Sequence, residues 1–226
     1  MILRLTAPGE IKVTCPPRLA RQHLFTFVDS RKDWIEKQNT SLMAQDHWRN
    51  RCARPGESYL FLGDEYKLRD GMTFLKKVVV EFDQSAEQKT LWIHWPEHLY
   101  AAKDSEEGRL LAWKSLRLRM RTEAEKVLTD RTRIYAQQME LRPSELSFRS
   151  QKARWGSCSS NGKISLNRRL LGAPVPVIDA VVVHELSHMV HMNHSKNFWA
   201  LVARFAPEHK AADLWLGQNA HRLLAV

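Results

Sequence analysis

The first hundred residues alternate apolar and polar side chains over short runs, and turn residues separate these runs. A period of two is typical of β-strands with one covered face. We therefore expect short strands at residues 10–14, 58–62, 76–80 and 90–94. One stretch has its apolar residues at helical spacing instead, and it predicts an amphipathic helix, in one or two pieces, at 18–38.

The pattern changes after a polar stretch at residues 103–108. Residues 110–138 are rich in helix formers, and apolar side chains recur among Arg, Glu and Lys, which predicts one long helix. Strands are expected next at 146–152 and 163–167. The turn-forming residues at 159–162 predict a hairpin that leads into the second of them.

Helices are expected to complete the chain. Pro174 and Pro176 introduce an apolar helix at 177–192. Ser195 is a suitable N-cap for a helix through Phe205, and Pro207 is suitable as the first residue of a last helix. These elements predict an α+β fold. We expect a β-rich N-terminal subdomain at 1–108 and a second subdomain at 109–226, or one continuous domain made of both.

Composition narrows the class of protein. With 226 residues and 43% hydrophobic content, the chain can form a packed core, which excludes a disordered or fibrous protein. Three cysteines, without paired short spacings, are read as thiols in a reducing compartment. No secretory signal and no apolar run of about 20 residues is present. We therefore expect a cytoplasmic protein with no membrane partner; nothing in the sequence specifies an oligomeric state.

Positive charge is concentrated in one segment. Lys and Arg outnumber Asp and Glu by 35 to 25, which gives a net charge of +10. The whole surplus lies between Arg109 and Arg169, where 15 basic residues face 5 acidic ones. Such a segment favours anionic partners and is a candidate for nucleic-acid contact. A solvated helix face with pairs of opposite charge one turn apart explains it equally well.

The sequence His-Glu-Leu-Ser-His at His184–His188 is an HExxH pattern inside the apolar helix. Positions i and i+4 lie on one helix face, so both imidazoles can bind one Zn²⁺ at about 2.0–2.1 Å. Glu185 can reach a water molecule at that metal and act as the catalytic base. The alternative is a helix whose histidines are solvated or satisfied in the core, but Ala180–Val183 buries the helix beside them.

A catalytic zinc needs a third protein ligand. His191 lies about 10 Å along the axis from His184 on an unbroken helix, too far to share the metal. If the chain turns back at Asn193, a residue that tolerates the left-handed conformation, His194 can reach it. Glu208, on a following helix, is the alternative third ligand.

Four runs in this order carry a family resemblance: Arg154–Cys158, Gly162–Asn167, His184–His188 and Asn193–Trp199. In content and spacing they resemble the YgjP-like branch of the SprT-like zinc metallopeptidases. The resemblance is strongest from residue 109 to the C-terminus. The N-terminal half carries no sharp motif.

The resemblance implies a zincin-like catalytic half with one zinc ion. It implies zinc ligands at His184, His188 and His194 and a catalytic Glu185, the set that the spacing favours while leaving Glu208 as the alternative third ligand. It also implies that the strand at 163–167, which includes Lys163, is the edge strand that pairs with an extended substrate.

Several other residues in these runs have ordinary structural roles as their first interpretation. Trp155, Phe198 and Trp199 are expected in the core, and Cys158 is expected to be a small buried residue rather than a nucleophile. Arg154 and Lys196 are candidate substrate-binding residues because either can meet negative charge. Lys163 is a third candidate, from its place in the substrate-pairing strand.

These observations leave three classes of function. A zinc metallopeptidase acting on a peptide or protein is the first. A metal-dependent hydrolase of a small anionic substrate such as a nucleotide is the second, although no glycine-rich phosphate loop supports it. A nucleic-acid-binding protein with a structural metal is the third.

Overall fold

The computed structural model describes residues 1–7, 10–16, 19–36, 38, 53–85, 87–151 and 154–223. It contains two compact units, Met1–Arg51 and Cys52–Val226. In the first unit, β1 (Ile2–Ala7) pairs antiparallel with β2 (Glu10–Thr14), and α1 (Arg21–Asp29) and a helical segment at 32–36 follow. The helix expected at 18–38 is therefore in two pieces, and residues 18 and 37 lie outside the described residues.

The second unit begins with a four-stranded sheet in the order β3-β4-β6-β5. Its strands are β3 (Ser58–Phe61), β4 (Asp64–Thr73), β5 (Val79–Asp83) and β6 (Thr90–Pro96). The strands expected at 58–62 and 90–94 are confirmed, but the one expected at 76–80 begins only at Val79. Lys76 and Lys77 lie in an exposed bend, and β5 starts where Val79 can pair with His94 of β6.

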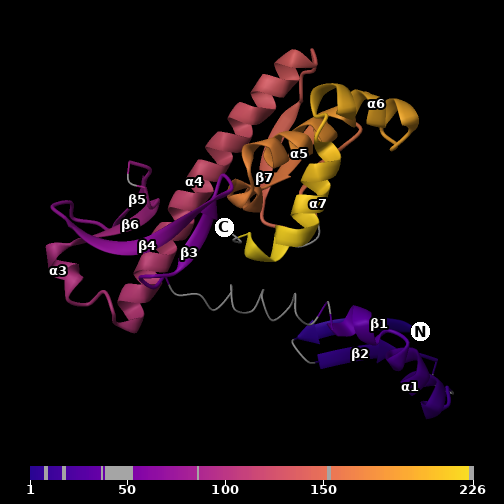
Figure 1. The fold of residues 1–226 in the computed structure, drawn as a ribbon, viewed down its shortest axis with the longest axis horizontal. Helices are drawn as coiled ribbons and strands as arrows, with labels where there is room; N and C mark the ends of the chain where they lie inside the picture. The colour runs from indigo at the N-terminus through magenta and orange to yellow at the C-terminus, as the bar shows by residue number, and fades with distance from the viewer. Residues whose placement is uncertain are drawn as a thin grey trace. The chain divides into compact units, whose positions relative to one another are not determined.

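A short helix, α3 (Glu97–Tyr100), leads into the long helix α4 (Glu106–Gln138). The long helix starts four residues before the expected position because the Ser105 hydroxyl accepts a hydrogen bond from the Gly108 N–H, 3.0 Å away, and caps it. Its buried residues recur every fourth position: Gly108, Ala112, Leu116, Met120, Ala124, Leu128, Thr132 and Ala136. Figure 1 shows the β3–β6 sheet beside the N-terminal half of α4 and α5 beside its C-terminal half.

A second sheet has the order β7-β9-β8. It comprises β7 (Glu145–Arg149), β8 (Gly156–Cys158) and β9 (Lys163–Asn167). The hairpin between β8 and β9 turns at 159–162 as expected, with Gly162 at φ +73°. The strand at 163–167, however, is central rather than an edge, because β7 pairs with one side of it and β8 with the other. The expectation from the resemblance that 163–167 is an edge strand is therefore wrong, and the edges of this described sheet are β7 and β8.

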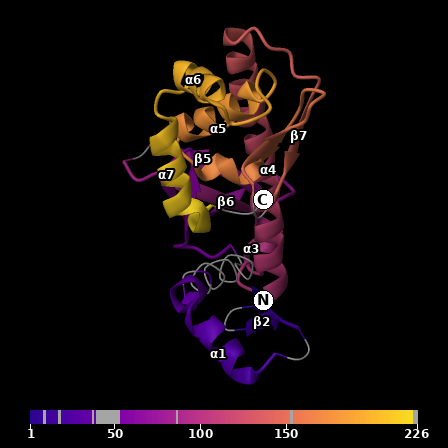
Figure 2. The ribbon, with the colours of Figure 1, turned by 90° about the vertical axis from the view of Figure 1, so that its right-hand side faces the viewer.

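Three α-helices follow among the described residues after β9, and Figure 2 shows them together beside α4. After η1 (Arg168–Gly172) come α5 (Val175–Ser187), α6 (Lys196–Phe205), α7 (His209–Asn219) and the short η2 (Ala220–Arg222). The Ser195 hydroxyl caps α6 as predicted. Pro207 does not begin the last helix, because it lies in the turn two residues before His209.

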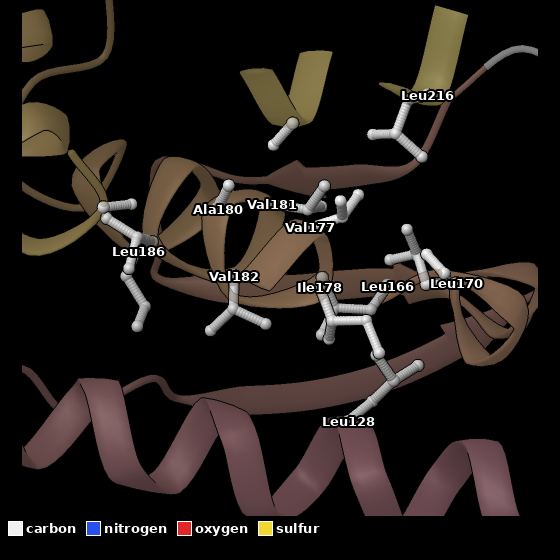
Figure 3. Packing of buried hydrophobic residues seen from close by; sticks show 14 of the residues in the cluster. Leu128, Leu166, Leu170, Val177, Ile178, Ala180, Val181, Val182, Leu186 and Leu216 are labelled. Atoms are coloured by element: carbon white, nitrogen blue, oxygen red, sulfur yellow. The ribbon is translucent and has the colours of Figure 1, made fainter. Parts of the chain in front are cut away.

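The main core surrounds α5, which packs on opposite sides against α4 and α7. Figure 3 shows Ile178 and Val182 directed toward Leu128 of α4, and Ala180 and Val181 on the side of Leu216 of α7. A helix enclosed in this way needs apolar residues around most of its circumference, which the run at 177–183 supplies.

The second unit joins the β3–β6 sheet to the predicted catalytic half. The backbone N–H groups of Leu62 and Gly63 donate to the carbonyls of Leu171 and Gly172 in η1, at 2.7 and 3.2 Å. The mixed α+β class expected from the sequence is confirmed, and the division at residue 108 stays a prediction. None of the helices that the structure describes has the length and apolar character that crossing a bilayer requires.

Candidate metal centre

Helix α5 positions the HExxH residues at its C-terminal end. Val182, Val183 and Leu186 are fully buried around it, so the helix is fixed on several sides. The rings of His184 and His188 lie one turn apart, with centroids 4.9 Å from each other. Both are half-buried, and they face the same side of the helix, as the i, i+4 spacing predicts.

The helix ends at Ser187, five residues earlier than expected, and this lets the chain return. Tight turns follow it, in which the N–H groups of Met189 and Val190 bond carbonyls three residues back. The N–H of Ser195 then bonds the carbonyl of Asn193 at 2.9 Å. The return does not use a left-handed Asn193, because that residue is absent from the described positions with positive φ.

The return brings His194 to the other two histidines. The Nε2 atoms of His194 and His184 are 3.2 Å apart, and ligand atoms of His184, His188 and His194 all lie within 4.8 Å of one another. Glu208, the alternative ligand, is not in this group of described residues. The structure thus gathers the three imidazoles that the sequence indicated.

The arrangement fits a zinc ion. Two nitrogens at 2.0–2.1 Å from one tetrahedral zinc stand about 3.3 Å apart, close to the separation of the His184 and His194 nitrogens. The Nδ1 of His188 lies 3.2 Å from the carbonyl oxygen of His191. Because a carbonyl only accepts, Nδ1 carries the proton, which leaves Nε2 of His188 with its lone pair free for a metal.

Aromatic rings hold the three imidazoles in place. Phe198, fully buried at the start of α6, lies 4.6–5.0 Å by ring centroids from each of them. The indole of Trp199 stacks on His194 at 5.6 Å and on His209 at 5.5 Å, with 23° between planes in each case. Phe198 is a core residue as expected, whereas Trp199 is half-buried and belongs to the site.

Burial shifts the ionisation of the site. It lowers the pKa of His184 to about 4, with help from the neighbouring histidines, so this imidazole is neutral at neutral pH, as metal binding requires. It also raises the pKa of the Glu185 carboxyl to about 7, against the opposing charge of Arg154. A carboxyl with such a pKa is suited to taking and giving up a proton near neutral pH.

Gly156 allows the edge strand β8 to approach Glu185. A Cβ atom at this position would lie 2.5 Å from Oε1 and 2.7 Å from Cδ of Glu185, closer than real carbon atoms approach. Any other residue would therefore displace the carboxyl from its place beside the strand. The motif around residue 156 was recognised in the sequence, but this reason for its glycine appears only in the structure.

The family description "YgjP-like, metallopeptidase domain" matches residues 1–219. The chain belongs to the YgjP-like metallopeptidase family. It is also similar to the metallopeptidase zymogen of Pyrococcus abyssi abylysin, a crystal structure, with 25% identity and a TM-score of 0.35 over 42% of this chain and 93% of that chain. No curated protein matches it.

Membership in the YgjP-like family implies a metallopeptidase-type hydrolase with a metal cofactor. In this YgjP-like domain the three candidate substrate-binding residues fall in different places. Arg154 is exposed and lines a cavity next to Glu185. Lys163 forms an ion pair with Glu145 on the neighbouring strand, at 2.7 Å. Lys163 and Lys196 are not among the described residues that line this cavity.

Two further residues of the YgjP-like site correct or extend the expectations. Cys158 on β8 is partly buried, and burial together with the charge of Glu185 raises the pKa of its thiol. A raised pKa leaves less of the thiolate, which is the nucleophilic form of cysteine. His209 was not foreseen, because it starts α7 and reaches the site only through tertiary packing, where its Nδ1 donates to the carbonyl of Ala206 at 3.0 Å.

Proposed function

We propose that this protein is a zinc-dependent peptidase. In this proposal His184, His188 and His194 hold one Zn²⁺, and Glu185 is the general base. The observation that carries it is the convergence of three imidazoles, with ligand atoms within 4.8 Å of one another, at the end of the helix that presents the buried Glu185. When bound, zinc supplies a Lewis acid and makes water easier to deprotonate.

Glu185 performs the proton transfers in this reaction. Its carboxylate takes a proton from the attacking water as the water oxygen bonds to the peptide carbonyl carbon. As the C–N bond breaks, Glu185 returns a proton to the leaving nitrogen, so the carboxylate ends in its original state. The hydrogen bond from His188 to the His191 carbonyl keeps the imidazole of His188 in the tautomer that the site needs.

The free edge of β8 favours an extended peptide as substrate. The N–H of Asn167 donates to the carbonyl of Trp155, and the N–H of Ser159 donates to the carbonyl of Lys163. These bonds direct the backbone groups of Trp155 and Ser159, which flank β8, toward β9. In an antiparallel pair the intervening residues, Gly156 and Cys158, then direct their N–H and C=O groups outward. No described strand pairs with that edge, so a substrate chain can add to it beside Glu185.

The nucleotide alternative has less support. The buried residues of the cavity beside Glu185 are mainly apolar, and Arg154 is the cation among the described residues that line it, apart from the histidines. A triphosphate needs several cations or a backbone cradle to offset its charge. We therefore favour a peptide.

The test is the variant Glu185→Gln, which keeps the shape of the side chain and removes its proton-accepting charge. With zinc loaded, we expect hydrolysis of unfolded casein to fall by a factor of about 10²–10⁴, with zinc content unchanged. The matched control is Glu208→Gln, at an exposed position outside the histidine group, which should cleave like the parent protein. Equal cleavage by both variants would remove Glu185 from the reaction.

A further inference from the structure

A cavity of about 230 Å³ adjoins the candidate metal centre. Helices α5, α6 and α7 form its inner wall through Ala180, Val181, Val202 and Leu216, which are at most 8% exposed. The half-buried indoles of Trp155 and Trp199 form further parts of the lining. In Figure 3, Ala180 and Val181 lie on the side of α5 that faces Leu216.

The cavity reaches the residues that would carry out the reaction. His184 and Glu185 are part of its lining. Ala180 and Val181 precede these two residues by one helical turn, so the cavity and the reacting groups share a face of α5. A group bound in the cavity would therefore belong to a residue next to the bond that is cleaved.

The walls indicate the chemistry of that group. Exposed Arg154 and Asp213, of opposite charge, are the charged lining residues outside the histidines and Glu185, so the cavity favours neither sign. An apolar cavity of about 150 Å³ accommodates benzene. A cavity of about 230 Å³ with apolar walls accommodates the side chain of Leu, Met or Phe, whose burial is favourable.

We propose that this cavity is a specificity pocket for a bulky apolar side chain of the substrate residue next to the scissile bond. The proposal rests on the peptidase function proposed above. Transfer of such a side chain from water into the pocket gives an expected preference of roughly 10–100-fold in kcat/KM for Leu or Phe over Gly at that position.

The experiment uses the zinc-loaded full chain and peptides that differ only in one residue, Gly, Ala, Leu or Phe, beside the cleaved bond. Leu216→Trp places a larger side chain in the pocket, and Leu214→Trp introduces the same change on an exposed position of the same helix. We expect Leu216→Trp to lower kcat/KM at least tenfold more for the Leu and Phe peptides than for the Gly peptide. Leu214→Trp should resemble the parent protein.

Ala180→Val narrows the pocket with a smaller change, and it replaces Leu216→Trp as the test if that variant does not fold. A second measurement needs no turnover. We expect N-acetyl-leucinamide, added to the metal-free protein, to shift the indole N–H signals of Trp155 and Trp199 in NMR spectra, and N-acetyl-glycinamide to leave them in place.

Two results would overturn the pocket alone. Equal kcat/KM across the peptide series would do so and would leave the peptidase function standing. Indole signals that do not respond to N-acetyl-leucinamide would do so independently of catalysis. Failure of the zinc-loaded protein to cleave any peptide, with zinc binding intact, would overturn the peptidase function itself and the pocket's role with it.

Discussion

At the scale of single residues, the third metal ligand depends on how the chain leaves α5. His194 is exposed and outside any helix, yet its Nε2 lies 3.2 Å from that of His184. Spacing alone left His194 and Glu208 as alternatives, because it does not show where a helix ends. The early end of α5 at Ser187 gives the chain enough length to return and makes His194 the candidate ligand.

We therefore predict that His194→Ala lowers zinc affinity by at least a factor of 10, because removal of one of three protein ligands weakens the site. The measurement is competition with a chromophoric chelator at fixed pH. Glu208→Ala is the control and should bind zinc like the parent protein, since Glu208 is outside the histidine group. Full affinity in the His194 variant, with loss in the Glu208 variant, would reverse the assignment.

The site residues that the sequence predicts most directly are those that share one helix. His184, Glu185 and His188 follow from a spacing that any helix converts into a common face. His209 and the contact between Gly156 and Glu185 were not predictable, because they bring together segments far apart in the chain. Such contacts leave no periodic signal in the sequence.

At the scale of elements, an ion pair joins the long helix to the HExxH helix. Two guanidinium nitrogens of Arg131 on α4 each donate to the carboxylate of Asp179 on α5 at 2.6 Å. The hydroxyl of Tyr135 donates to the same carboxylate at 3.2 Å. Asp179 is buried, so the pair also fixes the orientation of the helix that presents His184.

We predict that Asp179→Asn lowers the free energy of unfolding by about 2 kcal/mol, because it leaves the half-buried Arg131 without its counter-charge. Asp130→Asn is the matched control, since Asp130 pairs with Arg133 on the exposed face of α4, the helix that also carries Arg131. This substitution should lower the free energy of unfolding by less than about 0.5 kcal/mol. Denaturation in urea measures both. A loss that is equal in the two variants would contradict this role for the buried pair.

Elements were predicted well where periodicity is strong and poorly where pairing decides. The long helix and the strand at 163–167 were expected nearly as found, because their patterns persist over their full length. The end of α5 and the start of β5 were misplaced. The turn at 188–191 ends α5, and pairing with β6 sets where β5 begins. Neither produces a periodic pattern in the sequence.

At the scale of the molecule, several cations of the basic segment have partners within the fold. Arg121 and Arg168 both pair with Glu125, and Arg168 connects η1 to α4 at 2.8 Å. Arg169 donates to the carbonyls of Ala220 and Leu223, which ties η1 to the C-terminal residues. These residues of the basic segment at 109–169 stabilise the fold without a nucleic acid. Nucleic-acid contact through the segment stays a prediction.

The compact units of the molecule predict which part of the chain folds independently. The compact unit Cys52–Val226 holds all the candidate site residues. It also includes the β3–β6 sheet, whose loop after β3 bonds η1 through Leu62 and Gly63. The sequence instead suggested a boundary after residue 108. Comparing fragments 52–226 and 109–226 therefore tests which of the two boundaries delimits a folded unit.

We predict that fragment 52–226 unfolds cooperatively and binds zinc with the affinity of the full chain. Fragment 109–226 should be much less stable, because η1 loses its hydrogen bonds to the loop after β3 and α4 loses the apolar cover of β5, where Arg119 lies over the Phe82 ring. Circular dichroism during thermal unfolding and chelator competition measure the two properties. A cooperative, zinc-binding fragment 109–226 would instead place the boundary at residue 108, with the β3–β6 sheet as a separate addition to the catalytic half.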